Sequence, residues 1–172
     1  MPHVSYLQPQ DAAEKVKETL DRIENKTGQV PHMLQLLGHS PELFHAFLPF
    51  TNSVRSMELD AGLRELAYLM VAHRLGCEVC THHHMGLARK ADLTEAQVSD
   101  LDSYETSDAY DEVQRSVLTF ADQVTTKGRA YGALVQSLHE FLGDRCVVEL
   151  AAVVAMANFT GRFNVSLGTE VP

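Results

Sequence analysis

The sequence predicts an all-α protein, a helical bundle of about seven to eight helices joined by short connections. Residues that start and stop helices recur along the whole chain, with apolar residues at helical spacing between them. Alternating β-branched residues and Asn-Gly hairpin turns, the marks of a β-sheet, are absent outside one apolar stretch near the C-terminus. A chain of 172 residues, of which 45% are hydrophobic and 22% charged, can bury a core of its own. We therefore expect a single domain over 1–172, with 1–27 as an N-terminal helical extension.

Three helices are expected at the start of the chain. The first covers 11–26, and Asp11 begins a capping box, in which side chains satisfy free N–H groups of the first turn. A short second helix stops at Gly38, where the missing side chain permits a left-handed end. The third starts at Pro41, because proline is preset for the first helical position, and Pro49 kinks or shortens it.

The central helix of the predicted bundle follows Asp60, which caps it. Residues 63–75 are apolar on nearly every side, so we expect this helix to be packed all round rather than along one stripe. Glu65 lies on it, and Gly76 ends it. An acidic side chain on so apolar a helix is a candidate functional group.

The C-terminal part supplies the remaining helices. Thr94 and Gln97 form a capping box, and apolar residues at helical spacing then indicate a helix that ends near Gly128. Another helix is expected over 131–142. In 144–159, valines are frequent enough for a buried strand, but the length of the segment favours a helix.

Composition excludes several classes of function. The net charge of -9 opposes a nucleic-acid backbone, and no cluster of Lys and Arg interrupts it, so we expect no nucleic-acid partner. The N-terminus lacks the basic segment and apolar core of a signal peptide, which favours a cytoplasmic location. The longest continuous apolar stretch, 150–157, is far shorter than the roughly 20 residues of a membrane span, so no membrane partner is expected.

Chemistry is concentrated at Cys77 and Cys80. In a reducing cytoplasm a Cys-x-x-Cys pair is more often catalytic or metal-binding than structural. Both cysteines follow the expected helix end at Gly76 and so begin a new helix, whose free N–H groups stabilise a thiolate. Within one helical turn, a sulfenic acid on one sulfur can be captured by the other. This pattern favours reversible thiol–disulfide chemistry.

Two further residues are predicted to handle protons for the pair. His84 lies four residues after Cys80 and therefore shares its helix face. If the central helix and the cysteine helix form an antiparallel hairpin at Gly76, Glu65 lies about 16 Å, His84 about 12 Å and Cys80 about 6 Å from the turn. His84 is then between the other two, and a relay Glu65–His84–Cys80, direct or through a water, is geometrically reasonable.

Zinc binding and inert burial are the alternatives for the cysteines. Cys77, Cys80 and His84 offer three zinc ligands and His82 or His83 a fourth, although structural zinc sites usually take their second ligand pair from another segment. Free cysteines are also commonly buried without a function. We read His82 and His83 as a solvated helix face, of which at most one faces the sulfurs.

Other residues of chemical interest are expected to be packing residues. Cys146 lies on an apolar segment and reads as core, and His73 reads as packed within its helix. Tyr131 and Phe141 are likewise expected to pack. None of the four is assigned a chemical role.

A faint internal similarity relates the tripeptide Glu-Leu-Ala that begins at Glu65 to the one that begins at Glu149. If the chain contained a duplicated unit, Gly161 and Asn164 would stand where the first copy has its two cysteines. We favour chance as the explanation.

The spacing around the cysteines resembles a known family. Glu65, an eleven-residue interval, Cys77-x-x-Cys80-x-x-x-His84 and the following Leu87-Ala88 resemble the signature of the alkylhydroperoxidase D-like (AhpD-like) branch of the carboxymuconolactone decarboxylase family. Further likeness to its peroxidase-related members extends over about residues 28–165. At the position before the second cysteine, where peroxidase members can carry a histidine, this chain has Val79.

The resemblance implies a fold, an assembly and a chemistry. Such proteins are all-helical, assemble as trimers or hexamers, and need no metal or organic cofactor. Cys80 would attack a peroxide, Cys77 would resolve the sulfenic acid, and Glu65 and His84 would move protons. The expected partners are a small hydroperoxide or disulfide substrate and an external thiol reductant.

We therefore expect an antioxidant oxidoreductase, a peroxidase-like enzyme with peroxiredoxin activity that works through a Cys77–Cys80 disulfide. One alternative is a cofactor-free lyase, as in the branch that gives the family its name. The other is a metal-binding or redox-sensing module.

Overall fold

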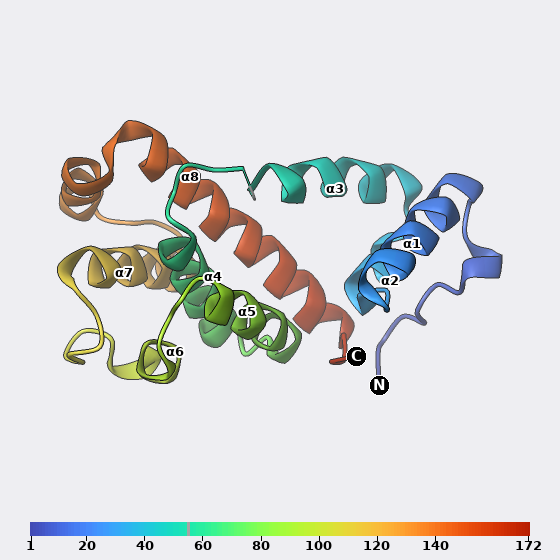
Figure 1. Ribbon diagram of the computed structural model, residues 1–172, viewed down its shortest axis with the longest axis horizontal. Helices are drawn as coiled ribbons and strands as arrows, with labels where there is room; N and C mark the ends of the chain where they lie inside the picture. Colours follow the sequence, from blue (N-terminus) through green and yellow to red (C-terminus); the bar gives the residue numbers. More distant parts are fainter. Residues whose placement is uncertain (55) are drawn as a thin grey trace. The chain divides into compact units, whose positions relative to one another are not determined.

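The computed structural model describes residues 1–54 and 56–172, and over these residues the chain is helical, with no strand (Figure 1). The all-α prediction is thereby confirmed. The elements in order are η1 (Pro9–Asp11), α1 (Glu14–Thr27), α2 (His32–Leu37), α3 (Pro41–Val54), α4 (Ala61–Leu75), α5 (Glu78–Lys90), α6 (Glu95–Ser99), η2 (Leu101–Ser103), α7 (Glu112–Lys127) and α8 (Gly132–Leu167).

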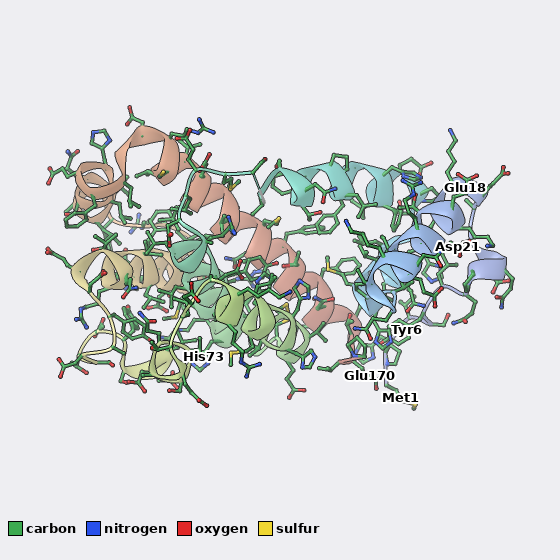
Figure 2. All side chains as sticks on the ribbon, in the orientation of Figure 1. Met1, Tyr6, Glu18, Asp21, His73 and Glu170 are labelled. Carbon is green, nitrogen blue, oxygen red and sulfur yellow. A yellow bond between two sulfur atoms is a disulfide. The ribbon has the colours of Figure 1, made fainter. Side chains whose placement is uncertain are left out.

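The contacts within the chain divide it into two compact units, and the first contains Met1–Ser56 and Ser166–Pro172. In it, α3 packs against α1 and α2 around buried side chains that include Val16, Leu37 and Phe44. The two chain ends meet: the backbone N–H of Glu170 donates to the Tyr6 hydroxyl at 3.0 Å, and the Glu170 carboxylate pairs with the N-terminal amine at 2.8 Å (Figure 2). The single domain expected from the sequence stays a prediction.

The second unit, Met57–Val165, contains the predicted site. Its central helix is α4, which packs against both α5 and α7, and nine of its residues are buried (Figure 1). The second half of α8 supplies further core residues, including Leu150, Val153 and Val154. The prediction of a central helix packed on all sides is confirmed.

Several predicted helix ends are confirmed. Asp60 caps α4 by accepting a hydrogen bond from the N–H of Leu63, and Thr94 with Gln97 forms the predicted capping box of α6. Gly76 and Gly128 end α4 and α7 with φ values of 62° and 72°, a left-handed conformation that glycine adopts without steric cost.

One predicted helix start and the conformation of one predicted helix end are wrong. Asp11 does not cap α1, because Pro9 begins a 3-10 turn that includes Asp11, and α1 starts three residues later with no side-chain cap. Helix α2 ends at Gly38 as predicted, but this residue has φ -60° and is right-handed. Its glycine is explained by packing instead, since a Cβ there would lie 2.8 Å from Leu7 Cδ2.

Proline and glycine act differently in the two long helices. Pro49 does not shorten α3, which continues to Val54. In α8, Gly143 has φ 76° and ψ 167°, so two helical segments meet there as the sequence predicts, but the second continues to Leu167. By length and composition alone, α8 could cross a membrane. The core helix of a soluble protein has the same properties, so these assign α8 no membrane role.

Four residues that were expected to pack are more exposed than predicted. His73 is exposed, and its Nε2 lies 2.7 Å from Asp102 Oδ1. Tyr131 is 50% exposed and Phe141 42%, and Cys146 is only partly buried. Tyr131 lies beside two cations at the C-terminal end of α7, which favours a position at the surface.

Candidate active site

The turn between α4 and α5 positions both cysteines. Gly76 reverses the chain at the end of α4, and the Cys77 N–H donates to the carbonyl of Ala72 at 2.9 Å. Cys77 is thereby fixed as the N-cap of α5, with its sulfur at the positive end of that helix. Cys80 lies one turn further along the helix. The predicted position of the pair at a helix start is confirmed.

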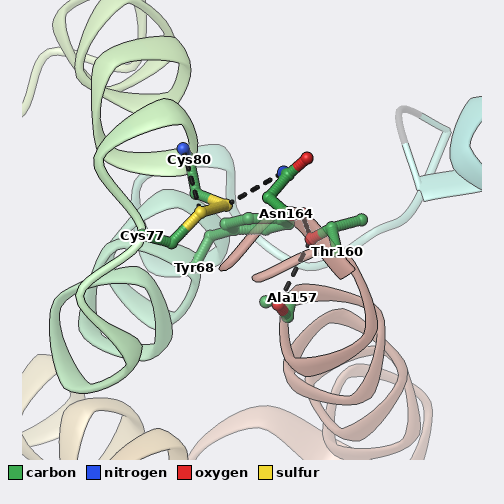
Figure 3. Close-up of a disulfide and its surroundings, with 6 residues drawn as sticks. All are labelled: Tyr68, Cys77, Cys80, Ala157, Thr160 and Asn164. Carbon is green, nitrogen blue, oxygen red and sulfur yellow. Dashed lines mark hydrogen bonds between the residues drawn. A yellow bond between two sulfur atoms is a disulfide. The ribbon is translucent and has the colours of Figure 1, made fainter. Parts of the chain in front are cut away.

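Cys77 and Cys80 are joined by a disulfide, with their Cα atoms 5.3 Å apart (Figure 3). The N–H of Cys80 donates to the Cys77 sulfur at 3.3 Å. Both residues are buried, with exposed fractions of 2% and 4%. A reactant therefore has to be small, or neighbouring side chains have to move, before it reaches either sulfur.

Glu65, which is buried, and His84, which is partly buried and one turn after Cys80 on α5, form a pair. Oε2 of Glu65 lies 2.6 Å from Nδ1 of His84, and the other carboxylate oxygen lies 3.5 Å from Nε of Arg64. When Nδ1 carries the proton and donates it to the carboxylate, Nε2 is left as the basic nitrogen. The predicted contact between Glu65 and His84 is therefore present. Within the described residues no hydrogen bond joins His84 to either sulfur, so the second half of the relay stays a prediction.

Tyr68 completes the surroundings of His84 and was not predicted from the sequence. The two rings stack with their centroids 3.5 Å apart and an interplanar angle of 15°. The Tyr68 hydroxyl hydrogen-bonds with the hydroxyl of Thr160 on α8. Burial raises the pKa of Tyr68 to about 12, the Thr160 hydrogen bond opposes this, and the charge of Glu65 adds to it. Its position three residues after Glu65, on the same helix face, was the available signal.

Asn164 is a second missed residue, and it contacts the cysteine pair directly. Its Nδ2 donates to the Cys80 sulfur at 3.5 Å, and its side chain is buried, with 4% exposed (Figure 3). Thr160 lies one turn before it on α8, so both polar side chains share a helix face. The available signal was the spacing of the two polar residues, four apart and so on one helix face.

The structure also bears on the zinc alternative. His82 and His83 are exposed on α5, as the sequence predicts for a solvated face. Over the residues that the structure describes, no three His, Cys, Asp or Glu side chains are arranged to hold a metal ion.

Two surface cavities, of about 310 and about 170 Å³, are lined by none of the predicted site residues. The larger is lined by Glu105, Glu112, Arg115, Ser116, Thr119 and Leu134, and the smaller by Met85, Arg89, Leu93, Glu95 and Val98.

Comparison of the sequence with protein families finds one match that bears on the site. Residues 41–123 match the model of the carboxymuconolactone decarboxylase family. This range includes the cysteine pair, Glu65, Tyr68 and His84, whereas Asn164 lies outside it. No curated protein matches the chain significantly.

Solved structures share the fold over nearly the whole chain. A peroxidase-related protein from Ralstonia eutropha, described as an alkylhydroperoxidase AhpD core, is 19% identical and superposes with a TM-score of 0.83 over 99% of this chain and 92% of its own. A peroxidase-related protein from Silicibacter sp. is 21% identical, with a TM-score of 0.82 over 98% and 91%. The debrominase Bmp8 is 22% identical, with a TM-score of 0.81 over 98% and 91%.

The family match and the shared fold agree with the cysteine signature from which the resemblance was drawn. The match covers the helices that carry the signature, and the AhpD-like structures extend the likeness to α8. Residues 41–123 thus carry the match to the carboxymuconolactone decarboxylase family, and the chain has the fold of AhpD-like proteins.

Proposed function

We propose that the protein is a thiol-dependent oxidoreductase that reduces small organic hydroperoxides through a Cys77–Cys80 disulfide. The observation that carries this proposal is the position of the two sulfurs, within bonding distance of each other at the start of a helix. The partly buried Glu65–His84 pair on the same two helices supports it. Peroxidase-related proteins of the same fold support the reaction class.

In the proposed cycle the Cys80 thiolate attacks the terminal oxygen of the hydroperoxide. An S–O bond forms, the O–O bond breaks, and the leaving alkoxide takes a proton to become an alcohol. The Cys77 sulfur then attacks the sulfenic acid on Cys80, so that the disulfide forms and water leaves. An external thiol reductant returns two electrons and two protons and restores both thiols.

Glu65 and His84 have the proton-transfer roles in this proposal. Glu65 holds His84 through Nδ1, which leaves Nε2 to accept a proton from a thiol or, once protonated, to donate it to the leaving alkoxide. Tyr68 stacks on the ring and restricts its rotation. We keep a homo-oligomer, a trimer or hexamer, and a cytoplasmic location as predictions.

A thiol count tests the proposal. The reduced protein is treated with one equivalent of cumene hydroperoxide and cleaved after glutamate, which puts Cys77 and Cys80 on different peptides because Glu78 lies between them. We expect two thiols to be lost per chain, at these two positions, while Cys146 stays reduced. An unchanged thiol count contradicts the proposal, as does one equivalent of tightly bound zinc in the reduced protein.

Reductive dehalogenation is a second candidate, favoured by the likeness to a debrominase. A cysteine-to-alanine variant of that enzyme has been solved with 2,3,4-tribromopyrrole. Here the Cys80 thiolate would attack the halogen, the carbon would take a proton, and Cys77 would displace halide to form the disulfide. Both reactions consume the same thiols, so only the substrate that is turned over distinguishes them. Halide release from a bromopyrrole without consumption of hydroperoxide favours dehalogenation.

The cofactor-free lyase gives a third outcome. Decarboxylation or isomerisation needs an acid–base pair but no disulfide. Turnover of a small lactone that survives alkylation of all thiols supports the lyase and contradicts both redox reactions.

A further inference from the structure

Buried polar side chains gather around the cysteine pair. Four polar or charged residues are buried in the described chain: Glu65, Thr125, Thr160 and Asn164. Burying such groups costs free energy unless each finds a partner. Three of them contact the site, where Glu65 bonds to His84, Thr160 to Tyr68 and Asn164 to Cys80. Their burial is explained by the site rather than by packing.

Helix α8 reaches the cysteine turn because a glycine permits close approach. A Cβ on Gly161 would lie 2.7 Å from Cδ1 of Leu75, the last residue of α4. Asn164 lies three residues further along α8, nearly one turn, and is thereby brought to the start of α5. Its amide reaches the sulfur of Cys80 across the interface between these helices (Figure 3).

The two sulfurs have different donors. Cys77 accepts from the backbone N–H of Cys80, at the positive end of α5. Cys80 lies one turn inside that helix and accepts from the side chain of Asn164. A donor to a sulfur stabilises its thiolate relative to its thiol, and does so more strongly in a buried site.

We infer that Asn164 is the residue that stabilises the Cys80 thiolate in the reduced protein, as a hydrogen-bond donor supplied by α8. This inference takes from the proposed function only the identity of Cys80 as the reacting sulfur. Asn164 therefore extends the site beyond the helices that carry the sequence signature.

Alkylation of the reduced protein tests the inference without any turnover. The rate of iodoacetamide addition at Cys80 is measured as a function of pH by peptide mass, and the midpoint of the profile reports the thiol–thiolate equilibrium. We expect Asn164→Leu, which keeps the size and removes the donor, to leave about five- to tenfold less Cys80 thiolate at neutral pH. Asn164→Asp, which replaces the donor by an acceptor, should shift the midpoint further in the same direction.

The chain provides its own controls. Asn158 lies on the same helix, but its amide donates to Thr125 and to the Val154 carbonyl, so Asn158→Ala should leave the Cys80 midpoint unchanged. Cys146 is an internal reference thiol, whose alkylation should be the same in every variant. If Asn164→Leu does not fold, the Cys80 midpoint of Asn164→Asp alone tests the inference, because aspartate preserves the shape of the side chain.

Either of two results overturns the inference. One is an unchanged Cys80 midpoint in folded Asn164→Leu or Asn164→Asp. The other is an equal shift in Asn158→Ala, which would mean that any damage to α8 has this effect. A shifted midpoint together with no hydroperoxide consumption in the parent protein would support the inference while contradicting the proposed function, so the two failures are distinguishable.

Discussion

The carboxylate of Glu65 and the imidazole of His84 form a direct hydrogen bond, 2.6 Å between Oε2 and Nδ1, with only 6% and 13% of their side chains exposed. The bond joins α4 to α5. The chain reverses direction between these helices at Gly76, a single left-handed glycine. It fixes which imidazole nitrogen can exchange protons with the solvent or a substrate. Four predictions follow from this arrangement and from its neighbours.

Removing the charge of Glu65 should slow the chemistry without unfolding the protein. Glu65→Gln keeps the shape but no longer stabilises a protonated His84, so we expect hydroperoxide to oxidise the thiols about ten- to hundredfold more slowly. Stopped-flow measurement of thiol loss gives the rate. Glu149→Gln is the matched control, because Glu149 begins the same tripeptide but pairs with Arg145 and the Leu59 N–H. Equal rates in Glu65→Gln and the parent protein would contradict the assigned role.

The two cysteines should be distinguishable by trapping. In the proposed cycle Cys77→Ser leaves a sulfenic acid on Cys80 with no partner, so dimedone should add to Cys80 after one equivalent of hydroperoxide. Cys80→Ser should give no adduct at Cys77, and Cys146→Ser should behave like the parent protein. Mass spectrometry of the peptides reads all three. A dimedone adduct on Cys77 in Cys80→Ser would reverse the assignment of attacker and resolver.

Tyr68 should make folding sensitive to alkali. Its folded pKa of about 12 is above the unfolded value of 10.0, so its protonated form is favoured by folding. The contribution to the free energy of unfolding is therefore complete below pH 10 and is lost as the pH rises from 10 through 12. A shift of two units corresponds to about 3 kcal/mol.

Tyr68→Phe isolates this contribution. The variant cannot ionise at this position, so its stability in urea should fall less between pH 10 and pH 12 than that of the parent protein. Other ionising groups, such as Tyr110, act in both proteins and cancel in the comparison. Identical pH dependence in the two would contradict the raised pKa. Tyr68→Phe should also keep the ring stack on His84, so thiol oxidation at neutral pH should change less than in Glu65→Gln.

Gly161 should be intolerant of larger side chains. Because a Cβ there meets Leu75 at 2.7 Å, we expect Gly161→Val to lower the free energy of unfolding by about 1–3 kcal/mol. Gly161→Ala should cost less, because the contacted atom is the end of a side chain that can rotate. Gly86→Ala is the control: Gly86 is also helical, has nothing within 4 Å of its Cβ position, and should gain about 0.5–1 kcal/mol. Urea unfolding of the three variants measures these differences.

Local signals were sufficient for most of the fold. Asp60, Gly76 and the capping box at Thr94 act through contacts within one turn of helix, so their effect can be predicted from neighbouring residues. Asp11 and Gly38 were misread for different reasons, one local and one not. A preceding 3-10 turn includes Asp11, and Leu7 packs against Gly38 from a distant part of the chain.

The candidate site likewise combines features that follow from nearby residues and features that depend on how helices pack. The sequence predicted that both cysteines lie at a helix start and that Glu65 lies next to His84, because a turn at Gly76 and the helical rise determine the order of groups along a hairpin. Tyr68 and Thr160 were missed, because a stack on His84 and a hydrogen bond between α4 and α8 depend on how helices pack.

The sequence by itself determined that the protein is all-α, where its cysteine helix begins, and that Glu65 and His84 lie near each other. Helix formation and capping depend on residues within a few positions, which a sequence states directly. Only the tertiary structure decided that α8 carries Asn164 to the sulfur of Cys80, 84 positions away in the sequence. That contact depends on the close approach of two helices at Gly161, and no local preference specifies such an approach.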